Sequence, residues 1–276
     1  MMNDSNPQPN GAKEDNSDMN TPYSENEAER VEAVEPEMIE AEADALGTPA
    51  DPIDTVVGGA QDELRFRVSD KVVVLSDPTS GEAEAIAAVR THLLAHHVRA
   101  GRRGLAVCAP NSKSGSTFMS VNLAVSLARA GIKTLLIDAD MRSPAIHKMI
   151  VPSREVPSLR DCLADTNVNY GDIIQEEVLP SLSIIYAGRS STRAQELLSG
   201  QRFKSLLDLC MREFEVTIID TPASNSNADG RRIASVVRYC IIVARKDKTY
   251  VSDVEALIEE MKSDKVNVIG TILNEF

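Results

Sequence analysis

The chain has 276 residues and a formal net charge of −13 at pH 7. The charge is uneven, because residues 1–64 hold 17 acidic and 2 basic side chains, whereas residues 65–276 hold 25 acidic and 27 basic ones. The nearly neutral larger part has no basic stripe or aromatic platform, which excludes general nucleic-acid binding. No apolar run approaches the ~20 residues of a membrane-spanning helix.

Residues 1–64 predict a disordered acidic tail. They are rich in Pro, Asn, Ser and carboxylates and poor in large apolar side chains, so they cannot bury enough surface to offset chain entropy. The stretch 25–46 favours a transient acidic helix. A solubilising tail and a docking segment for a basic partner both stay open as roles. The folded domain is expected over residues 65–276.

The cysteines and the N-terminus bear on the cellular compartment. Cys108, Cys162, Cys210 and Cys240 form no C-x-x-C pair, a usage typical of buried free thiols in a reducing compartment. The first residues, MMNDSNPQPNG, lack the basic and apolar regions of a signal peptide. We therefore expect a cytoplasmic protein that reaches the inner membrane only by recruitment to a partner.

The domain is expected to begin with a strand and a helix. The segment Leu64–Leu75 contains the run VVVL, which indicates a strand, and Gly81–Val98 has apolar residues spaced as on one side of a helix. His92 and His96 lie four residues apart on this helix. Without a third ligand, a solvated histidine face is a simpler interpretation than a zinc site.

The most informative stretch follows and ends in two aspartates, Asp138 and Asp140. Its predicted parts are a strand at Leu105–Ala109, a loop at 110–116, a helix at Thr117–Ala130 capped by Gly131, and a strand at Thr134–Ile137. Strand, glycine-bearing loop, helix, strand and acidic tip in this order are typical of a site for nucleotide phosphates.

The loop itself departs from the usual phosphate-binding pattern G-x-x-x-x-G-K-[ST], in which Lys reaches the outer phosphates and Ser or Thr binds magnesium. The matching residues, beginning at Pro110, are PNSKSGST. Gly115 and Thr117 occupy the second glycine and the hydroxyl position, but Ser116 replaces the lysine. The loop's own lysine, Lys113, comes three residues early. The motif alone is therefore a weak signal for phosphate binding.

After this stretch the chain alternates between helix and strand patterns. Expected helices are Ser158–Ala164, Gln195–Phe214, Asp229–Val237 and Val251–Lys262, and expected strands are Leu182–Tyr186, Val216–Ile219, Cys240–Ala244 and Val266–Leu273. This alternation predicts an α/β fold, a doubly wound and mostly parallel sheet with helices on both faces. Ligands of such sheets bind at the carboxyl ends of the strands.

Three aspartates follow strands at that edge of the sheet: Asp138, Asp140 and Asp220. With the Thr117 hydroxyl they offer the hard oxygen ligands that magnesium prefers. Clustered carboxylates also repel one another unless a cation lies between them. Each aspartate alone is explained as a cap of the turn after its strand. The three together predict a magnesium site beside the glycine loop.

Several segments resemble the cytoplasmic bacterial tyrosine kinases of exopolysaccharide and capsule synthesis, which include the CpsD/CapB-like proteins and the kinase domains of Wzc-like chain-length regulators. The segments are LLIDADMRSP, IIDTPAS, VIGTILN, DPTSGEAEAIAAVRTHL and YAGRSSTRAQELLSG, and the resemblance covers about residues 70–276. It implies a P-loop NTPase fold of the MinD/ParA-like group and ATP with Mg²⁺ as cofactors. It also implies self-association and a Wzc-like or CapA-like membrane polysaccharide copolymerase as partner.

Carried over by position, the resemblance assigns roles to individual residues. Asp138 would be the base or metal organiser of the second acidic motif and Asp140 its magnesium-shell partner, while Asp220 would match the Walker B aspartate. The cofactor-binding residues would be Gly115, Ser116, the magnesium-binding Thr117, and Asn274, which resembles an adenine-holding asparagine near the last strand.

Three features of the family's pattern are missing. The phosphate-loop lysine is Ser116, and no tyrosine follows Tyr250, so the family's C-terminal tyrosine cluster is absent. The E-x-x-R-x-x-R self-association pattern keeps Glu84 and Arg90 but has Ala87 in its middle. The features for binding phosphate, for accepting a phosphoryl group and for self-association into a ring are thus all weakened.

Two hypotheses follow. In the first, the protein is a pseudokinase that keeps the fold and nucleotide binding and regulates a membrane polysaccharide copolymerase. In the second, it is an active ATP-dependent tyrosine autokinase in which Lys113 bends over the loop and replaces the missing amine, beside Asp138 and Asp140. A third reading, a MinD/ParA-like positioning ATPase, is disfavoured because its signature lysine falls at Asn111.

Overall fold

The computed structural model describes residues 38–41, 64–224 and 227–275. Its central sheet has the strand order β1-β10-β9-β3-β8-β4-β7-β6. In this order the bounds are Met38–Ala41, Asn267–Asn274, Tyr239–Arg245, Gly104–Cys108, Val216–Asp220, Thr134–Asp138, Leu182–Ile185 and Gln175–Leu179. Neighbouring strands are parallel except for β6 with β7, which confirms the doubly wound, mostly parallel α/β fold.

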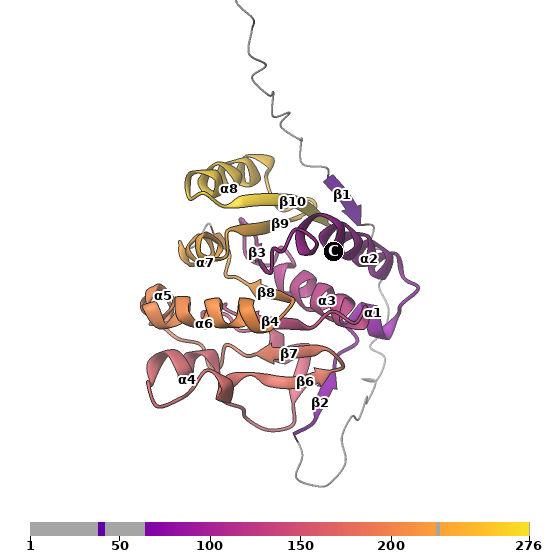
Figure 1. The fold of residues 1–276 in the computed structure, drawn as a ribbon. Helices are drawn as coiled ribbons and strands as arrows, with labels where there is room; N and C mark the ends of the chain where they lie inside the picture. The colour runs from indigo at the N-terminus through magenta and orange to yellow at the C-terminus, as the bar shows by residue number, and fades with distance from the viewer. Residues whose placement is uncertain (1–37, 42–63, 225–226, 276) are drawn as a thin grey trace, which may run out of the picture. The chain divides into compact units, whose positions relative to one another are not determined.

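Helices cover both faces of this sheet (Figure 1). On one face lie α2 (Gly81–Leu93), its π-helical extension η1 (Leu94–Val98) and α3 (Ser116–Arg129); on the other lie α5 (Ala194–Ser199), α6 (Gln201–Glu213), α7 (Asp229–Val237) and α8 (Val251–Ser263). Successive strand residues alternate between the faces, as the pleat requires. Leu136 and Ile218 pack with α2 and α3, whereas Leu135 and Ile219 pack with α5 to α7.

The predicted strand over the VVVL run is wrong. The strand β2 is confined to Phe66–Val68 and pairs antiparallel with β5 (Ile150–Pro152), and the run itself forms the one-turn helix α1 (Val73–Ser76). Helix α3 explains this outcome, because Asn122 Oδ1 accepts from the Val74 amide at 3.4 Å and Arg129 donates to the Val74 carbonyl. Contacts to α3 thus override the strand preference of valine.

Other elements differ less from expectation. The helix predicted over 195–214 is two helices that meet at Gly200, which has extended φ and ψ angles of −68° and 154°. The short helix α4 (Leu159–Ala164) confirms the helix expected at Ser158–Ala164, and its N-cap Ser158 forms a capping box with Asp161. Between residues 146 and 179, four elements were not predicted: β5, β6, and the 3₁₀ turns η2 (Ile146–Lys148) and η3 (Gly171–Ile173).

The acidic segment before residue 64 lies outside the described residues apart from 38–41. Those four residues form β1, parallel to β10, where a transient helix was expected over 25–46. The four cysteines are free and buried, as predicted. Among the described residues, no helix combines the length and apolar character needed to cross a bilayer.

Candidate functional site

The phosphate-loop region connects β3 to α3, and its conformation depends on glycine. Gly115 is the N-cap of α3 with φ of +92°, a left-handed conformation that glycine adopts without strain. A Cβ atom at this position would lie 2.0 Å from Nδ2 of Asn274. That Asn274 amide group donates to the Ser114 carbonyl at 3.0 Å. The last strand therefore holds the loop, and only glycine leaves room for the contact.

Gly115→Ala is expected to lower the free energy of unfolding by about 1–3 kcal/mol, because it adds backbone strain and displaces Asn274. Thermal unfolding measures this effect. Gly131→Ala is the matched control, since Gly131 has φ of +81° but open space around it. Equal losses of stability in both variants would show that the Asn274 contact is unimportant.

The hydroxyls of α3 point at the Walker B-like aspartate. Thr117 Oγ1 donates to Oδ2 of Asp220 at 2.7 Å, and Ser120 Oγ donates to Oδ1 at 2.9 Å. Burial raises the pKa of Asp220 to about 7, although both hydrogen bonds act in the opposite direction. Asp220 is thus held beside the positive end of a helix, next to the hydroxyl predicted to bind magnesium.

Asp138 lies directly across from Asp220, as register partners on β4 and β8. Burial first, and the nearby Asp220 second, hold the pKa of Asp138 well above its usual range. Its Oδ2 accepts from the amides of Ala145 and Ile146, both at 3.2 Å, and its Oδ1 accepts from the amide of Asp140. Asp138 therefore also fixes the loop that follows β4.

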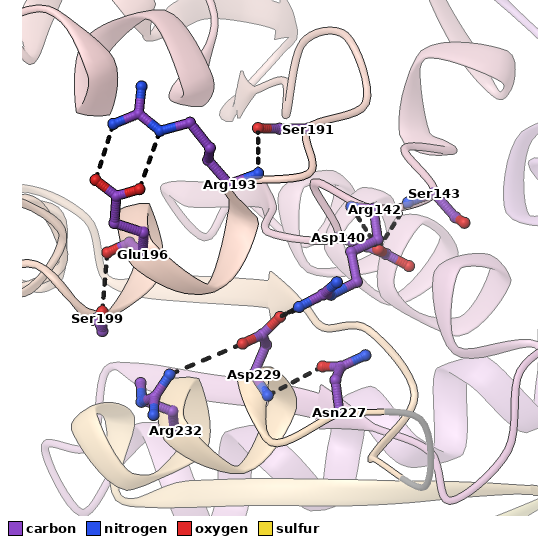
Figure 2. A network of polar contacts seen from close by, with 10 residues as sticks. All are labelled: Asp140, Arg142, Ser143, Ser191, Arg193, Glu196, Ser199, Asn227, Asp229 and Arg232. Carbon is purple, nitrogen blue, oxygen red and sulfur yellow. Dashed lines mark hydrogen bonds and ion pairs between the residues drawn. The ribbon is translucent and has the colours of Figure 1, made fainter.

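Asp140 and Arg142 belong to that loop and form the network in Figure 2. Asp140 Oδ1 accepts from the backbone amides of Arg142 at 3.1 Å and Ser143 at 2.9 Å. The Arg142 guanidinium donates to Oδ2 of Asp229, a buried side chain of α7. Sequence reasoning missed the Arg142–Asp229 pair. Asp229 was read only as a helix start, and nothing local indicates an acid 87 residues away from its partner.

Lys113 is the predicted replacement for the missing amine. It has φ of +63°, its side chain is exposed, and its carbonyl accepts from Nη1 of Arg245 at 3.1 Å. In residues 38–41, 64–224 and 227–275, no hydrogen bond or ion pair joins the Lys113 ammonium to another side chain. The backbone of this residue is anchored to β9, while its amine is available to a ligand.

The donor set fits a cation that is shared with a ligand. Within the described part of the chain, no three His, Cys, Asp or Glu side chains gather closely enough to hold a metal by themselves. Asp138 and Asp220 are nevertheless a buried acidic pair whose repulsion a cation would relieve. Magnesium commonly takes one or two carboxylates and completes its shell with water and phosphate oxygens. The Thr117 hydroxyl and this pair suit that mode of binding.

Comparisons with known proteins agree with this architecture. The model of an AAA domain family matches residues 105–268. The chain is 27% identical over 201 residues to the putative tyrosine-protein kinase CapB of Staphylococcus aureus, covering 72% of this chain and 86% of CapB. It is 31% identical over 171 residues to the tyrosine-protein kinase CpsD of Streptococcus agalactiae, covering 62% and 74%. Longer relatives also match: the chain spans 26% of the putative tyrosine-protein kinase EpsB of Ralstonia solanacearum at 29% identity over 71% of this chain.

Solved structures of related proteins have the same fold. The kinase domain of the Escherichia coli tyrosine kinase ETK superposes with a TM-score of 0.69 at 26% identity, covering 74% of this chain and 79% of that domain. The septum site-determining protein MinD of Pyrococcus horikoshii, solved with Mg-ADP, shares the fold at a TM-score of 0.54 and 18% identity, covering 62% and 70%.

Proposed function

Because the chain belongs to the AAA domain family, and within it to the CapB- and CpsD-like bacterial tyrosine kinases, we propose that it is an ATP-binding member with weakened phosphoryl transfer. In this proposal it regulates exopolysaccharide or capsule synthesis and export, in the cytoplasm, through a membrane polysaccharide copolymerase. One observation carries the proposal: Thr117 is bonded to Asp220 opposite Asp138, while Ser116 takes the lysine position.

Most of these residues are suited to binding nucleotide, but position 116 lacks the positive charge of the usual lysine. Loop amides and the N-terminus of α3 attract phosphate, and Thr117 with Asp220 and Asp138 would hold magnesium, which neutralises phosphate charge when bound. Phosphoryl transfer depends almost wholly on positioning and electrostatic stabilisation. A serine at position 116 supplies no positive charge to the transferred group, so the deficit falls on the chemistry more than on binding.

The second candidate function is an active tyrosine autokinase, with Lys113 as the missing cation beside Asp138 and Asp140. The unpartnered Lys113 ammonium favours it. Against it stands the position of Lys113, which comes before the glycine turn, with its carbonyl tied to Arg245. A lysine at 116 would instead extend from the first turn of α3.

Lys113→Ala separates the two candidates. We expect this variant to turn over ATP as slowly as the natural protein, near background, because Lys113 does not contact the transferred phosphate in the first proposal. A coupled assay of ADP release measures the rate, and the exposed Lys248→Ala is a charge-matched control. Clear turnover in the natural protein that Lys113→Ala removes would establish the active enzyme instead.

The regulatory part of the proposal is tested by binding to the cytoplasmic tails of a Wzc-like or CapA-like polysaccharide copolymerase. We expect ATP·Mg²⁺ to strengthen this binding in the natural protein, and we expect Thr117→Val, which loses the magnesium hydroxyl, to abolish the effect of nucleotide. No measurable binding to the tails, with or without ATP, would remove the regulatory role.

A further inference from the structure

A cavity opens beside the loop that follows β4. It has a volume of about 800 Å³ and is formed by residues 142–161 together with residues 186–190. No residue of the phosphate loop lines it, and neither Asp138 nor Asp220 does. Its volume falls within the usual range of ligand pockets, ~300–1,000 Å³.

The walls of this cavity carry more basic than acidic side chains, although burial and the nearby Lys148 lower the pKa of His147. The basic lining residues are Arg142, His147, Lys148, Arg160 and Arg189, and the acidic ones are Glu155 and Asp161. Glu155 is paired with a cation, whereas Asp161 is hydrogen-bonded but keeps its charge. Asp161 accepts from the Ser158 amide and hydroxyl in the cap of α4, and Glu155 pairs with Arg189 at 3.1 Å. Arg142 pairs with Asp229, so Arg160 and Lys148 remain against the single carboxylate of Asp161, and the lining keeps a net positive charge.

That charge comes mainly from Arg160 and Lys148. Arg160 is half-buried at the start of α4, where its amide donates to the Ala187 carbonyl, and Lys148 is exposed. Neither side chain has a hydrogen bond or an ion pair to another residue in the part of the chain that the structure describes. An arginine whose backbone is held in place and whose guanidinium donors are free is suited to a bidentate contact with a phosphate group.

An apolar wall lies beside these cations. It is formed by Pro144, Pro152 and Val156, and by Tyr186, whose ring is buried. The Tyr186 hydroxyl donates to the Ile150 carbonyl at 3.0 Å, so it is not free to bind a ligand. The cavity thus combines an apolar surface with net positive charge.

We propose that this cavity binds a phosphotyrosine side chain of another protein, presented on a peptide segment. The phosphate carries about −1.5 to −2 charges at pH 7 and matches Arg160 and Lys148, and the phenyl ring matches the proline and valine wall. An acidic peptide would use the cations but leave the apolar wall uncovered. The inference rests on the proposed function, and it makes the chain a reader of the modification that its relatives are named for.

The test is fluorescence anisotropy on the full chain, with a labelled peptide of glycine and serine residues around one phosphotyrosine. We expect binding at least tenfold tighter than for the same peptide carrying unmodified tyrosine or phosphoserine. Arg160→Gln is expected to weaken binding roughly tenfold, and Lys148→Gln by a smaller factor, because each removes a charge-assisted contact. Lys204→Gln, an exposed change on α6 outside the cavity, is expected to bind as the natural protein does.

Several results would overturn the inference. Equal affinity for the phosphoserine peptide, or displacement of the peptide by equimolar inorganic pyrophosphate, would show a general anion site. Natural affinity in both Arg160→Gln and Lys148→Gln would place the peptide elsewhere. Lys148 is exposed, so Lys148→Gln is expected to fold and tests the site by itself if Arg160→Gln does not fold. Binding of ATP·Mg²⁺, measured on the same proteins, reports separately on the proposed function, because these variants leave the phosphate loop intact.

Discussion

Ser116→Lys is expected to increase ATP turnover by about 10²–10³-fold, because removing one preorganised donor of charge typically costs that factor and restoring it reverses the loss. The position accepts the change. Ser116 begins α3 and is half-buried, and its backbone carbonyl, not its hydroxyl, accepts from Ser120 Oγ at 2.9 Å. A lysine there replaces a side chain with no hydrogen bond among the described residues.

Calorimetry with ATP and Mg²⁺, followed by measurement of turnover, checks this expectation. Ser112→Lys is the matched control, because it adds the same charge to an exposed position of the same loop. Binding in the natural protein shows that the site works without its lysine. Binding only in Ser116→Lys means that the lysine loss disabled an intact pocket. If neither protein binds ATP, the fold serves as a scaffold and the site assignments describe ancestry.

Asp220→Asn is expected to have opposite effects on stability and on ligand binding. In the free protein it should raise the free energy of unfolding above pH 7 by a few kcal/mol, on the order of 2–4, because it removes a buried charge that repels Asp138. The Thr117 and Ser120 hydroxyls can rotate to bond the new amide. Binding of ATP·Mg²⁺ should be lost, since the amide carries no charge for the cation.

The pH dependence of this effect has a definite sign. The folded-state pKa of Asp220, about 7, lies above its unfolded value of ~3.9. Between these values the folded protein binds more protons than the unfolded chain, so this group lowers stability as the pH rises. The gain in Asp220→Asn should therefore shrink from pH 8 to pH 5.5 and vanish below about pH 4. Thermal unfolding at these pH values checks this expectation, with the exposed Asp208→Asn as control. A gain that stays constant with pH would contradict the electrostatic cause.

Most strands of the sheet, and the helices that cover it, could be predicted because their sequence patterns are local. Runs such as TLLID and TIID are short, apolar and bounded by turns, which is typical of strands buried on both faces. The VVVL run has the same composition, and its helical turn depends on Asn122 and Arg129 of α3. Strand β6 escaped prediction because its sequence, QEEVL, is apolar only at its end and is exposed in the middle.

The candidate site was predicted where strand ends bring residues together. Asp138 and Asp220 end adjacent parallel strands, and Thr117 lies in the first turn of the helix after a third, so the fold class alone places them near one another. Interactions between loops could not be foreseen in this way. The Arg142–Asp229 pair and the basic cavity depend on the path of the chain after β4, which no periodic pattern specifies.

The hydrogen bond from Asn274 to Ser114 joins positions 160 residues apart. Contacts of such long sequence separation form late, because the intervening chain must first lose its conformational freedom. During synthesis, the loop preceding α3 leaves the ribosome long before β10 exists to support it. Under the proposed function, a nascent chain would therefore gain affinity for nucleotide only after β10 has docked, and ribosome-bound chains stalled before β10 should be unable to retain ATP.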